Sequence, residues 1–107
     1  MKKIAVFNKL VRDNIVEVIH KNNKSCSFHY ADTEEYKEKL LEKLLEEAKE
    51  FILEKNIEEL ADILEVIDSI LVAFEFDKDE VTKIKNNKSL DKGKFNKKII
   101  LEEVCED

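Results

Sequence analysis

Acidic side chains gather between residues 46 and 65 of this 107-residue chain. Eight residues of this segment carry carboxylates: Glu46, Glu47, Glu50, Glu54, Glu58, Glu59, Asp62 and Glu65. Two pairs have a spacing that suits a binding site, because Glu47 with Glu50 and Glu59 with Asp62 each place two carboxylates on one helix face. Carboxylates that converge in a partly buried place either take up protons or stay ionised around a divalent cation.

The composition of this acidic segment indicates which metal it would bind. Carboxylate oxygens without His or Cys select Mg²⁺, with Mn²⁺ able to replace it. Because Mg²⁺ usually keeps several waters and bridges to substrate phosphates, the segment suggests phosphate chemistry. The alternative is an ordinary solvated helix surface, since a chain with 25 acids contains such pairs by chance. The metal is favoured because Glu59 and Asp62 share an angular sector with apolar residues.

A short connection brings the two pairs together. Asn56 marks a tight turn, so the helices on either side of it are expected to fold antiparallel and to place Glu50 near Glu59 or Asp62. Only eight residues separate Glu50 from Glu59, so the hairpin must be tight and the pairing of the ligands can shift by one helical turn.

The elements that position these residues are predicted to be helices. The chain has no proline and a single glycine, Gly93, so it lacks the turn residues of a β-sandwich or barrel. Apolar periodicity and capping signals, such as Asp32 before Glu35, predict helices at residues 12–21, 33–55 and 57–76 and a short helix from Asp77 to about Asn87. Residues 26–30 can form a short strand, and residues 94–104 can return as a strand beside residues 3–7. The predicted fold is therefore mainly α, a four-helix domain with a small β element from the termini.

The length and the apolar pattern predict one domain, residues 1–107, within an oligomer. The helix at 57–76 is apolar over most of its circumference, more than a chain of this size can cover by itself. We therefore expect a homodimer or a higher homo-oligomer.

Charge and hydropathy exclude other classes of partner. The net charge is −6 and the basic runs lack interleaved aromatic residues, which argues against nucleic-acid binding. No stretch reaches the length of a membrane span or of a signal-peptide core. Cys26 and Cys105 match no metal-ligand spacing and are expected to be reduced thiols of a cytoplasmic protein, and His29 has no evident partner.

Two motifs resemble a known family. Glu47, Glu50, Glu59 and Asp62, with the flanking "EELADILEV", resemble the ExxE and ExxD signature of the all-α nucleoside triphosphate pyrophosphohydrolases, the MazG-like superfamily. The segment "FNKLVRDNIVEVI" and the tail "KGKFNKKIILEEV" are similar to the phosphoribosyl-ATP pyrophosphohydrolase-like branch of house-cleaning enzymes. The resemblance spans about residues 7–104, and Val16 stands where this branch is expected to have proline.

The resemblance implies a helical dimer or higher oligomer and Mg²⁺-dependent cleavage of a nucleotide, most readily a noncanonical nucleoside triphosphate, between its α and β phosphates. It implies metal and catalytic roles for Glu47, Glu50, Glu59 and Asp62. Two alternatives stay open: a phosphoribosyl-ATP pyrophosphohydrolase of histidine biosynthesis, and a helical dimer that has lost catalysis and serves as a binding or regulatory module.

Four basic residues are candidate phosphate ligands. Arg12, the single arginine, can act as a bidentate fork, and Lys9 or Lys94 can act as point charges. Lys43 is expected to pair with Glu47 at i,i+4 and can also reach phosphate. For any single lysine of the C-terminal part, including Lys94, a solvated lysine-rich surface is favoured over phosphate binding.

Overall fold

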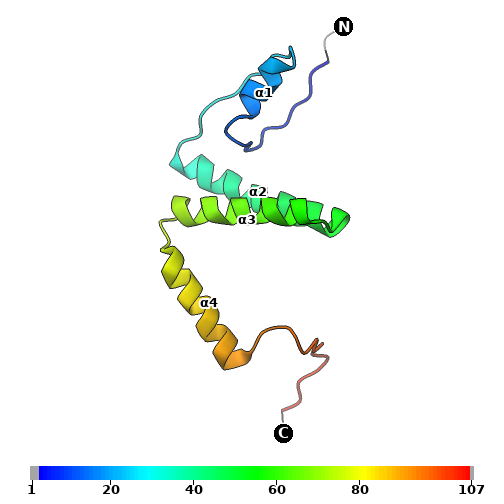
Figure 1. The fold of residues 1–107 in the computed structure, drawn as a ribbon, viewed down its shortest axis with the longest axis vertical. Coiled ribbons are helices and arrows are strands. Elements are labelled where there is room, and N and C mark those ends of the chain that lie inside the picture. Colours follow the sequence, from blue (N-terminus) through cyan, green and yellow to red (C-terminus); the bar gives the residue numbers. More distant parts are fainter. Residues whose placement is uncertain (1–2, 107) are drawn as a thin grey trace. The chain divides into compact units, whose positions relative to one another are not determined.

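The computed structural model describes residues 3–106, which form four helices (Figure 1): α1 (Ile15–Lys21), α2 (Thr33–Glu54), α3 (Ile57–Ala73) and α4 (Lys78–Lys92). The prediction of a mainly helical chain is confirmed. Two compact units can be distinguished, Met1–Glu75 and Phe76–Asp107. None of the described helices is both long enough and apolar enough to cross a membrane.

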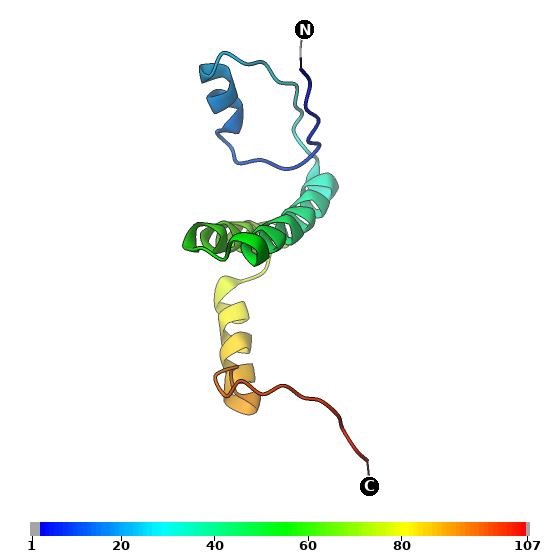
Figure 2. The same ribbon diagram turned by 90° about the vertical axis from the view of Figure 1, so that its right-hand side faces the viewer.

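Helices α2 and α3 form an antiparallel pair, referred to below as the hairpin, and lie side by side in both views (Figures 1 and 2). Lys55 ends α2 in the left-handed region, with φ of 51°, and its N–H donates to the carbonyl oxygen of Phe51 at 2.8 Å. Asn56 then begins α3, because its side-chain oxygen accepts a hydrogen bond from the N–H of Glu59 at 2.9 Å. The predicted tight turn at Asn56 is confirmed.

The buried core of the described residues is small and lies in the hairpin. Leu40 of α2 is 2% exposed and Val66 of α3 is 8% exposed, and no other described residue is fully buried. The sequence predicts a third helix that is covered on several sides, yet Val66 is the one buried residue of α3.

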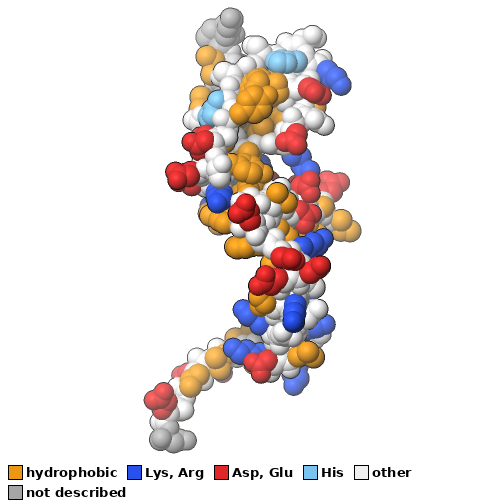
Figure 3. Space-filling view, turned by 90° about the vertical axis from the view of Figure 1, so that its left-hand side faces the viewer, with side chains coloured by type: hydrophobic (Ala, Val, Ile, Leu, Met, Phe, Trp, Pro, Cys, Tyr) orange, Lys and Arg blue, Asp and Glu red, His pale blue; other side chains and the backbone are white. Residues whose placement is uncertain are grey.

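Each helix of the hairpin therefore keeps a second apolar face in contact with solvent. We call these faces the outer apolar stripes, and their members are Leu41, Leu45 and Ile52 on α2 and Leu60, Leu64 and Ile67 on α3. Figure 3 shows hydrophobic side chains at the surface, among carboxylates, on the face that it draws. Exposed apolar stripes of this kind are typical of interaction surfaces.

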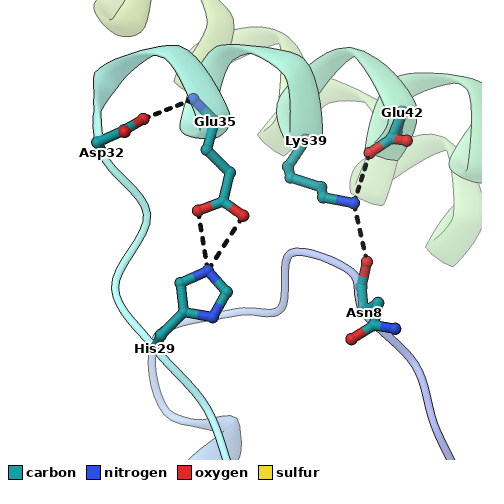
Figure 4. Close-up of polar contacts among 6 residues, drawn as sticks. All are labelled: Asn8, His29, Asp32, Glu35, Lys39 and Glu42. Atoms are coloured by element: carbon teal, nitrogen blue, oxygen red, sulfur yellow. Dashed lines mark hydrogen bonds and ion pairs between the residues drawn. The ribbon is translucent and has the colours of Figure 1, made fainter.

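The N-terminal segment is attached to α2 by polar contacts, one of which is drawn in Figure 4. Lys39 donates from Nζ to the backbone oxygen of Asn8 at 3.0 Å and pairs with Glu42 at 3.1 Å. Helix α1 begins at Ile15, whose N–H donates to the carbonyl oxygen of Arg12 at 3.1 Å. Arg12 therefore opens a turn before α1, and the predicted start of this helix at residue 12 is wrong by three residues.

The start of α2 is fixed by two side chains, which Figure 4 also shows. Asp32 accepts a hydrogen bond from the N–H of Glu35 at 2.9 Å, so the predicted cap is confirmed. The carboxylate of Glu35 also contacts Nε2 of His29 at 2.8 and 3.1 Å. His29 therefore has a partner, contrary to the prediction.

The second unit contains α4 and the C-terminal segment. Asp77 caps α4 by accepting hydrogen bonds from the N–H groups of Asp79 at 2.8 Å and Glu80 at 3.2 Å. The helix continues to Lys92, so the predicted end near Asn87 is wrong. It stops where Gly93 adopts a φ of 84°, a conformation that glycine reaches without steric cost.

The predicted strands are wrong for the described residues, which contain none. Residues 3–7, 26–30 and 94–104 have the composition of strands, but a strand also needs a neighbour that takes up its backbone N–H and C=O groups. Within 94–104 the chain turns instead, with the N–H of Lys98 donating to the carbonyl oxygen of Phe95 at 3.2 Å. Lys98 has a φ of 59°, which is incompatible with an extended strand.

Candidate metal centre

Three of the four predicted metal ligands come together across the hairpin. Glu47 of α2 and Glu59 and Asp62 of α3 each offer one carboxylate oxygen, and these three oxygens lie within 4.8 Å of one another. All three residues are half-buried. The fourth, Glu50, is exposed and does not belong to this group. We refer to Glu47, Glu59 and Asp62 as the carboxylate cluster.

Two cations already balance part of the charge of the cluster. Lys43 lies 3.5 Å from a carboxylate oxygen of Glu47, which confirms the predicted i,i+4 pair, and 3.5 Å from Glu46. Arg12 donates from Nη2 to Asp62 at 2.8 Å. Arg12, predicted to bind phosphate, therefore contacts one of the predicted metal ligands.

Glu59 is the uncompensated member of the cluster. Among residues 3–106 it has no ion-pair partner, in contrast to Glu47 and Asp62. Its removal from solvent, followed by the charges of Asp62, Glu50 and Glu47, raises the pKa of the Glu59 carboxyl above its ordinary value. A further positive charge is therefore most favourable beside Glu59.

The donor set of the cluster suits a hard divalent cation. Carboxylate oxygens are the ligands that Mg²⁺ and Mn²⁺ prefer. Oxygens bound directly to one Mg²⁺ lie at most about 4.2 Å apart, twice the length of the Mg–O bond. The observed limit of 4.8 Å is only slightly larger, so small rotations of the two flexible Glu side chains would let all three oxygens reach one ion.

The two remaining predicted phosphate ligands lie elsewhere. Lys9 pairs with Glu46 at 2.7 Å, outside the carboxylate cluster. This hydrogen bond raises the pKa of the Lys9 ammonium and lowers the pKa of the Glu46 carboxyl. Lys94 is exposed in the second unit, and the structure gives it no ion pair with another described residue. Its proposed role stays a prediction.

A pocket of about 420 Å³ adjoins the carboxylate cluster. Residues 10–15, Val18, α2 and α3 line it, and two members of the cluster, Glu47 and Asp62, are part of its wall. The charged residues of its lining are Arg12, Asp13, Lys43, Glu47, Asp62 and Glu65. The aliphatic residues of its lining are Leu10, Val11, Ile15, Val18, Leu40 and Val66. A ligand in this pocket would lie beside any cation that the cluster holds.

Several pocket residues were missed by the reasoning from sequence. Glu65 lies 3.9 Å from Nη1 of Arg12, and Ser69 lines the same pocket. A signal was present, because Glu65 and Ser69 follow Asp62 by three and seven residues and therefore share its helix face. Tyr36 of α2 also lines the pocket, together with residues 10–15, which are distant in the sequence, and no local pattern reveals this.

Comparisons of the chain with protein-family models, with curated proteins and with solved structures give no match. The family resemblance drawn from the two motifs therefore stays a prediction. The basis for a functional proposal is the carboxylate cluster, with the cations and the pocket that adjoin it.

Proposed function

We propose that this protein is a cytosolic, Mg²⁺-dependent nucleotide pyrophosphohydrolase. It cleaves a nucleoside triphosphate between the α and β phosphates and releases a nucleoside monophosphate and pyrophosphate. One observation carries the proposal: Glu47, Glu59 and Asp62 bring carboxylate oxygens within 4.8 Å of one another across the hairpin. Oxygen donors in this arrangement suit Mg²⁺, and Mg²⁺ in proteins commonly bridges to phosphate.

The residues around the cluster have distinct roles in this proposal. Glu47, Glu59 and Asp62 hold the ion, and the nearby charge of Glu50 adds to the attraction. When bound, Mg²⁺ neutralises phosphate charge, orients the triphosphate and lowers the pKa of a water that attacks phosphorus.

Arg12 and Lys43 supply the positive charge that the cluster itself lacks. The guanidinium of Arg12 is 59% exposed, so it is free to turn from Asp62 to a phosphate oxygen. The guanidinium of Arg12 can donate two parallel hydrogen bonds to phosphate, whereas the ammonium of Lys43, on α2, acts as a point charge. Both residues line the pocket, which places them beside a bound triphosphate.

The proposed assembly is a homodimer. The outer apolar stripes of α2 and α3 are exposed in the single chain, and a second copy that packs against them would remove them from water. Light scattering after size-exclusion chromatography should give twice the mass of the chain, 12.6 kDa, for the wild type. Leu45→Glu combined with Leu64→Glu should give a monomer, while Leu53→Glu, outside the stripes, should not. A monomeric wild type would contradict this assembly.

The activity is tested by measuring pyrophosphate release. The panel contains canonical, deoxy and damaged nucleoside triphosphates and phosphoribosyl-ATP, each with Mg²⁺ and with chelator. We expect release that requires Mg²⁺, is lost in Glu59→Ala and is retained in Glu58→Ala, which removes a neighbouring exposed acid outside the cluster. Equal activity of Glu59→Ala and wild type would refute the metal assignment. No release across the panel by the folded wild type would favour the alternative of a non-catalytic binding module.

A further inference from the structure

The pocket beside the carboxylate cluster contains polar side chains that the proposed chemistry does not use. Asn14, Tyr36 and Ser69 line it, and their side chains make no hydrogen bond to another residue of the range 3–106. Together they offer an amide, which both donates and accepts, and two hydroxyl groups. Polar atoms of a ligand could therefore bond to these three side chains without displacing another described residue from them.

The same pocket has an extended apolar wall. Ile15 and Val18 come from α1, Leu40 from α2 and Val66 from α3, so three helices contribute to it. Leu40 and Val66 are also the two buried residues of the hairpin, which makes this wall its most firmly packed part. The volume of about 420 Å³ lies in the usual range for small-molecule sites, about 300 to 1,000 Å³.

The charged and the apolar side chains of the pocket call for different parts of one ligand. Arg12 and Lys43 attract an anion, and Glu47 and Asp62 can share a cation with it. The apolar side chains, with Asn14, Tyr36 and Ser69 among them in the lining, suit a flat apolar group with hydrogen-bonding atoms at its edge. A lipid or a purely aliphatic acid would leave the amide and the hydroxyls unused, whereas a nucleobase with its sugar would use them.

We infer that this pocket binds the nucleoside part of the substrate, with the base against the apolar wall and polar atoms of the base or sugar bonded to Asn14, Tyr36 and Ser69. The inference rests on the proposed function, because it assigns the phosphates of the same molecule to the carboxylate cluster. Tyr36 and Ser69 would then help to select the base, because a wrong base that leaves one of their hydroxyl groups without a hydrogen bond would bind with lower affinity.

Binding experiments on the full chain separate this inference from the proposed activity. Isothermal titration measures the affinity for a nucleoside monophosphate, and separately for inorganic tripolyphosphate with Mg²⁺, which has no nucleoside part. Ser69→Leu places a larger apolar side chain in the pocket, and we expect it to weaken monophosphate binding about tenfold or more. Tripolyphosphate binding should change less than twofold, because the substitution leaves the carboxylate cluster intact.

A second variant with a smaller change keeps the test valid if Ser69→Leu does not fold. Tyr36→Phe removes only a hydroxyl and should weaken binding of the monophosphate by about two- to tenfold, whereas Tyr30→Phe, at a tyrosine that is 90% exposed and outside the pocket, should have no effect. In metal-free buffer the monophosphate should shift the backbone amide NMR signals of residues 10–18 and of Tyr36 and Ser69. The inference is overturned if these signals do not move, or if both Ser69→Leu and Tyr36→Phe bind the monophosphate like the wild type. Either result can be obtained whether or not the protein releases pyrophosphate.

Discussion

Replacement of Arg12 by alanine should have opposite effects on the binding of metal and of nucleotide. In the free protein Nη2 of Arg12 lies 2.8 Å from Asp62 and Nη1 lies 3.9 Å from Glu65. Both partners of the closer pair are partly solvated, with Arg12 59% and Asp62 38% exposed, so the pair contributes about 0.2 to 1 kcal/mol. A cation that binds Asp62 must share or displace this interaction. Without Arg12, the affinity for Mn²⁺ or Mg²⁺ should therefore rise by up to about fivefold.

Nucleotide binding should respond in the other direction. A charge-assisted hydrogen bond from Arg12 to phosphate contributes about 1.5 kcal/mol or more, so Arg12→Ala should weaken binding of a non-hydrolysable triphosphate with Mg²⁺ by about tenfold. Isothermal titration with Mn²⁺ alone and with the triphosphate measures both effects. Arg12→Lys is the matched control, since it keeps the charge and loses the fork, and it should stay close to the wild type for the metal alone. If Arg12→Ala weakened metal binding, or left both affinities unchanged, the reasoning about this residue would be wrong.

Three further substitutions test the electrostatics and the core. The pKa of Glu59 is raised, so the stability that this carboxyl contributes is present below its ordinary pKa of 4.5 and is lost as the pH rises through its pKa in the folded protein. In urea unfolding with chelator, Glu59→Gln should therefore gain stability relative to the wild type as the pH rises above 4.5. A difference in stability that does not change with pH would contradict the pKa shift. Glu46 has the opposite shift, because its hydrogen bond with Lys9 lowers its pKa and gives stability that is present above 4.5 and is lost as the pH falls through its folded value. Lys9→Gln should accordingly be less stable than the wild type at pH 7 and equally stable in strong acid, so a difference that persists in acid would count against the pair. Leu40→Ala should lower the free energy of unfolding by about 2 to 5 kcal/mol, whereas Leu53→Ala, 75% exposed on the same helix, should change it by no more than about 0.5 kcal/mol; similar losses at both sites would contradict the burial pattern.

The parts of the fold that the sequence predicts well are those set by neighbouring residues. Asp32 and Asn56 accept hydrogen bonds from N–H groups three residues ahead, so their capping roles are visible in a few letters of sequence. The convergence of Glu47 with Glu59 and Asp62 follows from the same local logic, because a two-residue connection forces α2 and α3 together.

The parts that were predicted wrongly or missed depend on distant partners. The strand expected at 94–104 has a suitable composition but no neighbouring strand among the described residues. The contact between Arg12 and Asp62 joins residues 50 positions apart, and the contact between His29 and Glu35 bridges a loop and a helix. Neither contact follows from a periodic pattern. Whether Glu47 or Glu50 joins the cluster depends on how α2 is rotated against α3, and the spacing of the acids in the sequence does not determine this rotation.

The most direct test of the central claim is the identity of the products. Phosphorus NMR of a nucleoside triphosphate incubated with the wild-type protein should show pyrophosphate and a nucleoside monophosphate in equal amounts when Mg²⁺ is present. With chelator, or with Glu59→Ala purified in parallel, the triphosphate should remain intact. Orthophosphate and a diphosphate as the products, or formation of pyrophosphate that persists in chelator, would contradict a pyrophosphohydrolase that works through the carboxylate cluster of the hairpin.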